Sequence, residues 1–331
     1  MNAAIRIGTR GSALAMAQTQ TVARALERAS GRAVELVPIT THGDTSSESL
    51  SQLGGTGVFA SALREALLAG DCDLVVHSMK DLPAVEYPGL TIGAVPKRAD
   101  ARDALCARDK LTLATLPAGA RVGTGSPRRI AQLREARPDL TVVDIRGNVD
   151  TRIGRVHDGD LDAVILAVAG LSRLGRADAA TDVFELESWP TAPGQGALAI
   201  EVREDTARGS SGAGHRGDAR AADAQLARAL ASISHSTTVA TTLAERTVLA
   251  RLEAGCAAPI GATAMIDTEL FFLTATVYAP DGSARITSSH AASLESQSVS
   301  DRRAAALDVG GRVADELLAA GAAELAPLKG A

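Results

Sequence analysis

Short runs of valine, isoleucine and leucine alternate along this chain with stretches in which apolar residues recur every three to four positions. The runs read IRIG, VELVPI, DLVVHS, LTIGAV, RVGTG, TVVDI and AVILAV. Runs of this length are typical of buried strands, and the intervening period is typical of helices. Strands that alternate with helices pair in parallel, because a parallel connection requires a crossover. The chain is therefore expected to form an α/β fold with largely parallel sheets.

Two pairs of similar segments recur in the same order. Residues 5–18, IRIGTRGSALAMAQ, resemble residues 121–132, RVGTGSPRRIAQ, and residues 70–82, GDCDLVVHSMKDL, resemble residues 159–171, GDLDAVILAVAGL. A chain of 331 residues also exceeds what one hydrophobic core usually serves. The pattern predicts two similar α/β lobes, although repeats this short also arise by chance.

The C-terminal third is organised differently. Residues 205–222 are rich in glycine, serine, alanine and charge without apolar periodicity, which is typical of a linker. A long helix is expected at about 235–253, followed by strands around the turn Pro280-Asp281-Gly282 and by a closing helix. Strands linked by hairpins and accompanied by helices predict a small α+β third domain.

The charge and the aromatic content argue against nucleic acid as a partner. The net charge is −5, the pI is near 5.7 and aromatic residues make up 2% of the chain. A general nucleic-acid binder needs a basic surface that displaces counterions, and a single-strand binder needs aromatic platforms for the bases. Any anion site in this chain is therefore expected to be local.

The apolar runs and the cysteines indicate a cytoplasmic chain. No run is long enough to span a bilayer, and the start MNAAIRIGTRGS lacks the apolar core of a secretory signal. Cys72, Cys106 and Cys256 lie far apart, and neither they nor the six histidines show metal-ligand spacing. We therefore expect free thiols, no metal and no membrane association.

Arginine gathers at turns where a predicted strand passes into a helix. The residues concerned are Arg10, Arg128, Arg129, Arg146, Arg152 and Arg173, and the turns also carry Ser12, Ser126 and Asn148 at positions typical of N-caps. Cations near a helix N-terminus oppose the helix dipole unless an anion binds there. The whole set predicts a site for a polyanionic ligand, and solvated surface arginine is the alternative for any single member.

Asp81 lies in HSMKDLP directly after a buried-looking strand, at a place where α/β proteins form ligand sites. A carboxylate there can act as a general acid or stabilise a cation, and the neighbouring Lys80 can pair with a substrate carboxylate. An ordinary turn carboxylate and a solvated lysine are the alternatives.

Cys256 follows the expected helix terminator Gly255 in RLEAGCAAPIGA. A thiol in such a loop can serve as a nucleophile or as an attachment point, although cysteine in general is more often a structural residue. Cys72 and Cys106 lie within apolar strand patterns, so we interpret them as small core residues.

Seven segments of the chain resemble the hydroxymethylbilane synthase (porphobilinogen deaminase) family, in the family's order. They are IGTRGSALAMAQ, VHSMKDLP, GTGSPRR, RGNVDTR, AVAGLSRL, APGQGALAIE and LEAGCAAPIG. Each is weak by itself, but the seven together extend along almost the entire chain, and that makes the resemblance specific.

The resemblance implies a fold of two lobes like those of periplasmic binding proteins and a C-terminal domain that carries the cofactor cysteine. The first lobe would comprise residues 1–98 together with 196–204, which return from the second lobe at 99–195. Residues 205–222 would then link the lobes to the C-terminal domain at 223–331. The family also implies a monomer.

The resemblance implies roles for individual residues as well. Cys256 would hold a dipyrromethane cofactor, made from two porphobilinogen molecules, through a thioether, and Asp81 would be the central catalytic carboxylate. The residues expected to bind the acetate and propionate groups of the cofactor and the growing chain are Arg10, Ser12, Ser78, Lys80, Thr124, Ser126, Arg128, Arg129, Arg146, Arg152, Arg173 and Gln195. Phe59, just after a glycine-rich lid expected at residues 42–57, is an expected lid contact.

The activity implied by the resemblance is the stepwise deaminating condensation of four porphobilinogen molecules. Asp81 would assist the loss of ammonia and stabilise the resulting azafulvenium cation, which the terminal pyrrole of the growing chain attacks. Hydrolysis would release linear hydroxymethylbilane while the primer stays on the enzyme. The implied reaction needs neither a metal nor a nucleotide.

Two features depart from the family pattern. Many members have a lysine within a glycine-rich lid, here residues 42–57, where this chain has Thr56, and the linker also looks longer than usual. The rival interpretation is a non-catalytic two-lobed protein that binds a polycarboxylate, because a fold does not determine a function. That interpretation leaves Cys256 and its loop unexplained.

Overall fold

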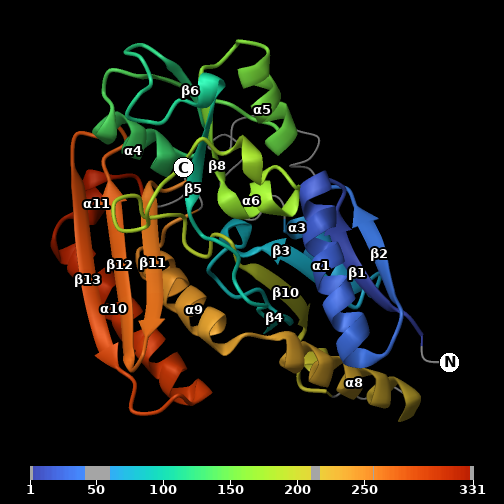
Figure 1. Cartoon of the computed structure of the whole chain (residues 1–331). Helices are drawn as coiled ribbons and strands as arrows, with labels where there is room; N and C mark the ends of the chain where they lie inside the picture. The colour runs from blue at the N-terminus through green and yellow to red at the C-terminus, as the bar shows by residue number, and fades with distance from the viewer. Residues whose placement is uncertain (1–2, 42–59, 210–216, 256, 329–331) are drawn as a thin grey trace. The chain divides into compact units, whose positions relative to one another are not determined.

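The computed structural model describes residues 3–41, 60–209, 217–255 and 257–328 (Figure 1). The chain separates into two compact units. Gly57–Arg98 and Ala197–Val239 belong to the first unit with the N-terminal segment, and Ala99–Gly196 and Ala240–Ala331 belong to the second. The positions predicted for the lid, Phe59 and Cys256 lie outside the described residues.

The first unit is built on a five-stranded sheet in the order β2-β1-β3-β10-β4. Its strands are β1 (Ile5–Arg10), β2 (Val34–Ile39), β3 (Leu74–Ser78), β4 (Leu90–Ala94) and β10 (Leu198–Arg203). Strand β1 pairs in parallel with β2 and β3, whereas β10 runs antiparallel to β3 and β4. The sheet is therefore mixed rather than largely parallel, because β10 returns to it from the opposite direction after the second lobe.

The helices of the first unit are α1 (Ala13–Ser30), α3 (Ser61–Ala69), the short α7 (Glu204–Ala207) and α8 (Gly217–Ile233). Ser12 caps α1, as its sequence position predicts, and its hydroxyl accepts a hydrogen bond from the Ala15 N–H at 3.3 Å. Leu26 of α1 packs on Ile5 and Ile7 of β1 in the core that lies between this helix and the sheet.

Helix α8 packs in the first unit, beside α1 (Figure 1). Leu226 and Leu230 lie on one face of α8 and are buried in the same core as α1, and Gln225 donates a hydrogen bond to the Ser30 carbonyl. The sequence predicts a linker at 205–222 and a C-terminal domain from residue 223 onward. The packing shows instead that the apolar face of α8 covers the first sheet, and that α7 and the start of α8 occupy part of the expected linker.

The second unit contains a five-stranded sheet of matching layout, in the order β7-β6-β8-β5-β9. Its strands are β5 (Asp103–Ala107), β6 (Arg121–Gly123), β7 (Thr141–Val143), β8 (Ala163–Ala167) and β9 (Asp182–Val183), and its helices include α4 (Pro127–Ala136), α5 (Val149–His157) and α6 (Val168–Arg173). Strand β6 pairs in parallel with β7 and β8, and β5 is antiparallel to β8 and β9. The two sequence repeats therefore occupy equivalent places, since β1 and β3 in one sheet correspond to β6 and β8 in the other.

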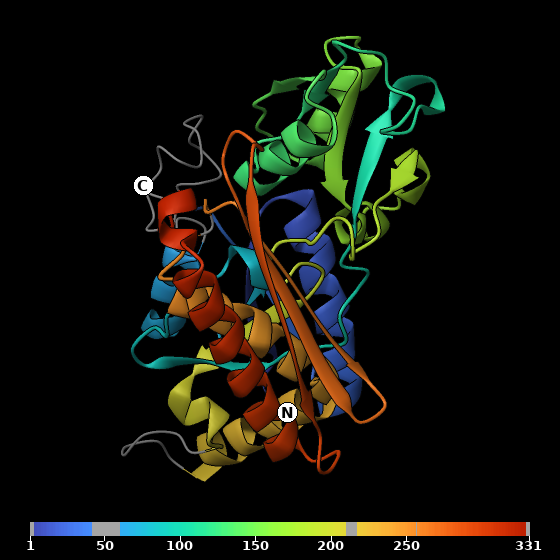
Figure 2. The same cartoon turned by 90° about the vertical axis from the view of Figure 1, so that its left-hand side faces the viewer.

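The C-terminal part of the second unit is an antiparallel sheet, β11-β12-β13, with helices on it. Its elements are α9 (Ser236–Arg251), β11 (Ile260–Asp267), β12 (Leu270–Tyr278), β13 (Arg285–Ser293), α10 (Val299–Ala319) and α11 (Ala322–Leu325). Helix α10 runs along one face of the sheet (Figure 2) and buries Val309, Val313 and Leu317 against Phe271 and Leu273. These elements, with the two mixed sheets, confirm the expected fold of two α/β lobes and a small α+β domain.

Buried Glu245 of α9 joins the C-terminal sheet to the end of the second lobe. Its carboxylate accepts hydrogen bonds from the Gly194 N–H at 2.7 Å and from the Ala264 N–H at 2.9 Å. A buried carboxylate needs such partners, so this contact fixes the loop before β10 against β11.

Candidate functional site

In the first unit, the expected site residues gather where β1 and β3 end. These strands are parallel neighbours, so their carboxyl ends lie at the same edge of the sheet. Arg10 is the last residue of β1 and Ser78 is the last residue of β3. Lys80 and Asp81 follow in a single turn of 3-10 helix, Met79–Asp81. The ends of β1 and β3 therefore bring these residues to one edge of the sheet.

The turn that carries Asp81 is held by the apolar residues on either side of it. Met79 and Leu82 are buried, and the Met79 N–H donates to the Ala197 carbonyl at 3.0 Å. Asp81 is half-buried between them, and no hydrogen bond or ion pair joins its carboxylate to another of the described residues. The turn therefore has a fixed backbone and a carboxylate that is not engaged by the described part of the protein.

Gln18 was not predicted from the sequence, yet it contacts Ser78 directly. Its side-chain amide donates to the Ser78 hydroxyl at 2.9 Å, and the hydroxyl lies 3.3 Å from the amide oxygen. Gln132 occupies the equivalent position in the sequence repeat and is also buried. The shared Ala-Gln at the end of both repeat segments was the signal that could have identified these residues.

In the second unit, the expected residues Thr124 and Ser126 lie at the N-terminus of α4. Thr124 is fully buried, and its N–H donates to the Val143 carbonyl at 3.0 Å. Gly125 between them approaches the Ile145 carbonyl so closely that a Cβ would lie 2.6 Å from the oxygen. Ser126 is the N-cap residue and Pro127 occupies the first turn, as predicted, but the Ser126 side chain makes no capping hydrogen bond.

Arg128 and Arg129 are buried close together, because both guanidinium groups pair with the buried carboxylate of Asp103. Arg128 Nη1 lies 2.9 Å from Asp103 Oδ2, and Arg129 Nη2 lies 2.5 Å from Asp103 Oδ1. Arg128 also donates to Gln132 Oε1 at 2.7 Å, and Arg129 donates to the Ile165 carbonyl at 3.0 Å. The arginines are 3% and 5% exposed, which rules out the surface alternative for these two.

Asp103, at the start of β5, was not predicted from the sequence. It is fully buried, and it also accepts hydrogen bonds from Gln195 Nε2 at 2.8 Å and from Trp189 Nε1 at 3.2 Å. Burial by itself would raise the pKa of this carboxyl, but the charges of Arg129 and Arg128 outweigh burial and hold the pKa well below its usual range. The only feature of the sequence that could have indicated this role is the position of an aspartate at the start of an apolar strand.

Arg152, on α5, lies in a cluster of positive charge. Its Nε donates to the Gly147 carbonyl at 2.9 Å. Burial and the neighbouring charges of Arg129 and Arg146 lower the pKa of Arg152 to about 10. Arginine resists deprotonation, so the lowered pKa marks a place where an added anion would be stabilised.

Arg173 and Gln195 bind backbone oxygens of the second unit. Arg173 Nη2 donates to the Gly196 carbonyl at 2.7 Å, and burial lowers the pKa of its guanidinium group. Gln195 Nε2 donates to the Ala101 carbonyl at 2.7 Å in addition to Asp103. Both side chains therefore hold the loop that leads into β10.

Three buried guanidinium nitrogens of this cluster have no hydrogen-bond partner among the described residues. They are Nε of Arg128, Nε of Arg129 and Nη1 of Arg146. Leaving a buried donor unpaired costs about 1–3 kcal/mol, and more when the group is charged. Orphan donors on three neighbouring cations indicate an anionic ligand in this part of the second unit.

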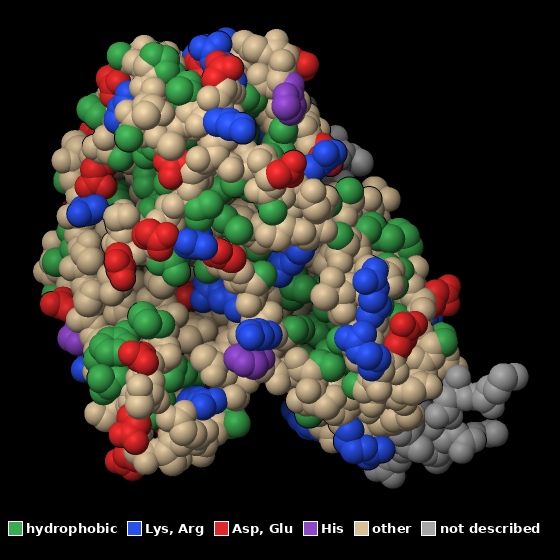
Figure 3. All heavy atoms as spheres, in the orientation of Figure 1, with side chains coloured by type: hydrophobic (Ala, Val, Ile, Leu, Met, Phe, Trp, Pro, Cys, Tyr) green, Lys and Arg blue, Asp and Glu red, His purple; other side chains and the backbone are tan. Residues whose placement is uncertain are grey.

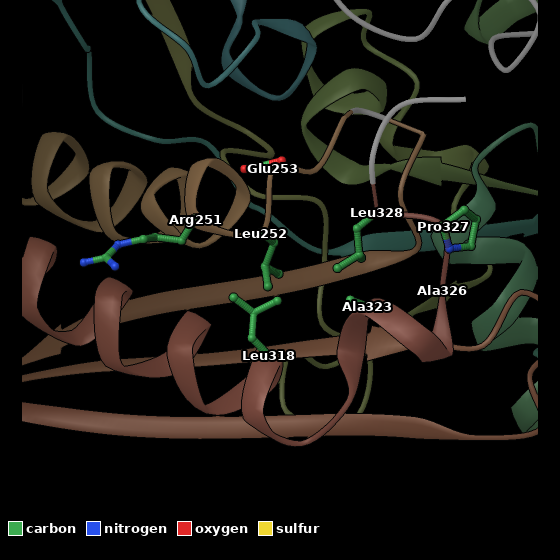
Figure 4. Close-up of a pocket in the computed structure, with 8 residues that line it drawn as sticks. All are labelled: Arg251, Leu252, Glu253, Leu318, Ala323, Ala326, Pro327 and Leu328. Atoms are coloured by element: carbon green, nitrogen blue, oxygen red, sulfur yellow. The ribbon is translucent and has the colours of Figure 1, made fainter.

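Gly255, which precedes Cys256 in the sequence, follows α9 and contacts the C-terminal tail. The Gly255 N–H donates to the Leu328 carbonyl at 3.3 Å. A cavity of about 460 Å³ opens between these segments and α10 (Figure 4). It is lined by Arg251, Leu252, Glu253, Leu318, Ala323, Ala326, Pro327 and Leu328.

The other two cysteines are buried, as the sequence predicts. Burial raises the pKa of Cys72 to about 11 and the pKa of Cys106 to about 12. Neither thiol is therefore a nucleophile near neutral pH.

On the face shown in Figure 3, acidic and basic side chains are interspersed. The overall charge of −5 gives no general attraction for anions, so the binding of an anion would depend on local groups of arginine. Among the described residues, none of the helices has both the length and the apolar character needed to cross a bilayer. The described residues also include no group of three or more potential metal ligands.

Two protein-family models match the chain. The first, described as the dipyrromethane cofactor-binding domain of porphobilinogen deaminase, matches residues 5–210. The second, the C-terminal domain of porphobilinogen deaminase, matches residues 239–319.

Curated relatives carry the same name. A porphobilinogen deaminase of Leifsonia xyli is 66% identical over 99% of this chain and 95% of the relative. A porphobilinogen deaminase of Cutibacterium acnes is 50% identical over 98% of both chains, and porphobilinogen deaminase 1 of Streptomyces coelicolor is 48% identical over 97% of both.

Solved structures that align with the chain include periplasmic binding proteins. One, of Salmonella typhimurium and specific for arginine, is 15% identical with a TM-score of 0.37 and covers 70% of this chain and 93% of its own. Another, from Coxiella burnetii, is 14% identical with a TM-score of 0.40 and covers 69% of this chain and 94% of its own. The family assignment rests on the sequence matches, which extend from β1 to α10: the chain belongs to the porphobilinogen deaminase family.

Proposed function

We propose that this chain joins four porphobilinogen molecules, with loss of four molecules of ammonia, into linear hydroxymethylbilane on a dipyrromethane primer attached to Cys256. The family membership supports the activity. The structural observation that supports the ligand is a set of buried guanidinium nitrogens, on Arg128, Arg129 and Arg146, that have no partner in the described part of the chain. Each pyrrole of the primer and of the growing chain carries two carboxylates, so the ligand is a polyanion that such donors bind.

The second unit supplies the arginines for this polyanion. Its proposed ligand-binding residues are Thr124, Ser126, Arg128, Arg129, Arg146, Arg152, Arg173 and Gln195. Burial and the charges of Arg129 and Arg146 lower the pKa of Arg152, and the charge of Asp144 offsets only part of this. A carboxylate beside it would relieve that repulsion.

The first unit supplies the reacting carboxylate. When bound, the dipyrromethane provides the free pyrrole carbon to which the first substrate is joined. Asp81 stabilises the cation that porphobilinogen becomes when its aminomethyl group leaves as ammonia, because a fixed carboxylate favours nearby positive charge. Arg10, Ser12, Ser78 and Lys80 surround that edge of the sheet and bind substrate carboxylates.

The proposal also includes the oligomeric state, the location in the cell and the lid contacts that the family resemblance implies. The enzyme works as a monomer in the cytoplasm. It consists of the two lobes and the C-terminal domain. Phe59 and the lid at residues 42–57 contact the growing chain. Light scattering coupled to size-exclusion chromatography of the purified protein would measure one chain per particle.

Intact-mass measurement before and after brief incubation with porphobilinogen tests the function. The expected protein carries an excess mass of two porphobilinogen units less two ammonias, and porphobilinogen adds a ladder of further pyrrole units. The control variant Cys256→Ser should show its unmodified mass and no ladder. A folded wild-type protein whose mass porphobilinogen never changes would sink the proposal and favour a binding protein.

A further inference from the structure

We infer that Asp103 is a positioning residue that orients the ligand-binding arginines of the proposed active site. The inference rests on the proposed function. It deepens that function, because Arg128, Arg129 and Gln195, which are three of the proposed ligand-binding residues, share this one carboxylate. Asp103 itself is fully buried and so contacts no substrate in this state of the protein.

The carboxylate of Asp103 accepts two hydrogen bonds at each of its oxygens. Oδ1 accepts from Arg129 Nη2 and Gln195 Nε2, and Oδ2 accepts from Arg128 Nη1 and Trp189 Nε1. An ionised carboxylate has about four lone-pair sites and no hydrogen to donate, so these four donors use its full capacity. No uncharged side chain of similar size offers two such oxygens.

This arrangement determines which guanidinium nitrogens remain for a ligand. Arg129 uses Nη2 for Asp103 and Nη1 for the Ile165 carbonyl, which leaves Nε as its unpartnered donor among the described residues. Arg128 uses Nη1 for Asp103, Gln132 and the Pro190 carbonyl, and neither its Nε nor its Nη2 has a partner among the described residues. Asp103 therefore binds a terminal Nη atom of each of the two guanidinium groups.

The balance of buried charges also indicates that positive charge remains for a ligand. Arg128 and Arg129 are adjacent in the sequence and both are buried, and one negative charge can neutralise only one of them. The surplus positive charge reaches across to α5, since Arg129 lowers the pKa of Arg152. Asp103 thus permits two buried cations to lie together while the site as a whole still attracts an anion.

Replacing Asp103 by asparagine tests the inference. In Asp103→Asn the side-chain NH₂ faces two N–H donors whichever way the amide lies, so at least one arginine or Gln195 loses its anchor. We expect the KM for porphobilinogen to rise at least tenfold while kcat stays within threefold of wild type. Folded Asp103→Asn protein that fails to acquire its primer would also support the inference, because the same arginines bind the carboxylates of the primer.

Trp189→Phe is the matched control. It removes one hydrogen bond to Asp103 Oδ2 without touching an arginine, and phenylalanine retains an aromatic ring beside Phe184. Its KM should stay within twofold of wild type even if the melting temperature falls. A tenfold rise in the KM of this control would overturn the inference, because the defect would then follow from local packing.

A double variant keeps the test decisive if Asp103→Asn does not fold. Asp103→Asn/Arg128→Gln removes one buried charge of each sign, so the net buried charge is unchanged. It is compared with Arg128→Gln alone, and we expect a KM at least fivefold higher in the double variant because Arg129 has lost its anchor. Equal KM values in these two variants, or a fall in kcat without a change of KM in Asp103→Asn, would overturn the inference. The proposed function is judged separately, by the mass ladder of the wild-type protein.

Discussion

Arg128 shows how the surroundings of a side chain decide its role. Near the N-terminus of α4 its charge opposes the helix dipole, and the sequence alone allowed either a bound anion or exposure to solvent. The structure provides an internal anion instead, since Asp103 lies 2.9 Å from the guanidinium group. The guanidinium nitrogens that have no partner among the described residues, such as Nε of Arg128 and Nε of Arg129, remain for a ligand.

At the same scale, replacing Asp81 by asparagine should lower kcat by roughly 10²–10³, the loss expected when one electrostatic stabiliser of a charged transition state is removed. The protein should keep its fold and its primer, because no hydrogen bond or ion pair joins the Asp81 carboxylate to another described residue. Single-turnover assays together with intact mass would measure both effects. Full activity in the loaded variant would contradict the role of Asp81.

The buried thiols should resist alkylation. With the pKa of Cys72 raised to about 11 and that of Cys106 to about 12, almost none of either thiol is ionised at pH 8, and the thiolate is the nucleophile. Native protein treated with iodoacetamide at pH 8 and digested should show neither residue modified, whereas unfolded protein should show both. Rapid modification of Cys72 in the native protein would contradict the burial described here.

At the scale of elements, β10 is the strand that ties the first unit together. It enters from the second unit, inserts between β3 and β4, and places Glu201 against α3. Arg64 of α3 donates to both oxygens of Glu201, with the closest distance 2.9 Å, and His77 Nε2 lies 3.3 Å from the same carboxylate. Burial would raise the pKa of Glu201, but the contacts with His77 and Arg64 lower it on balance.

Removing that carboxylate should destabilise the first unit strongly. Glu201→Gln leaves Arg64 buried without its counter-charge, which costs about 3–5 kcal/mol of unfolding free energy at pH 7. The pKa of Glu201 is lower in the folded state, so the wild-type advantage is present above the unfolded pKa of about 4.3 and is lost as the pH falls through the folded value. Urea unfolding from pH 7 down to pH 3 measures this.

The matched control for that variant is Glu204→Gln on the adjacent α7. Glu204 pairs with Arg208 four residues later, and both side chains are largely exposed. Such a pair contributes about 0.5 kcal/mol or less. If both variants lost the same stability, the buried ion pair would not be what holds α3 to β10.

At the scale of the whole molecule, two lobes with the same strand order carry different parts of the proposed chemistry. The first contributes the Asp81 edge and the second contributes the arginine cluster, and the whole chain has a net charge of −5. Attraction of an anionic substrate therefore depends on the local field of the arginines.

Salt should consequently weaken substrate binding more than it affects chemistry. Raising the ionic strength shortens the distance over which charges act on one another, to about 3 Å at 1 M. The KM for porphobilinogen should therefore rise roughly several-fold between 0.05 and 0.5 M potassium chloride. Potassium citrate at the same ionic strength should raise KM further, because a polycarboxylate competes for the arginines. A KM that is independent of both salts would contradict a site that attracts its substrate through surplus positive charge.

Local patterns in the sequence were sufficient for the class of fold. Apolar runs and helical periods predicted the strands, the repeat at residues 5–18 and 121–132 corresponds to β1 with α1 and to β6 with α4, and Ser12 and Asn148 are the N-caps that their positions indicated. These features depend on residues close together in the chain, whose interactions a sequence displays directly.

Contacts between distant residues decided the rest. Nothing near position 103 indicates that its carboxylate meets Arg128, Arg129 and Gln195, and nothing in the polar stretch before α8 indicates that this helix packs beside α1. The direction of β10, which makes the first sheet mixed, also follows from the path of the chain through the second lobe. Partners far apart in the sequence meet only when the sheets form, so ion pairing, burial and the pKa shifts that follow from them belong to the tertiary structure alone.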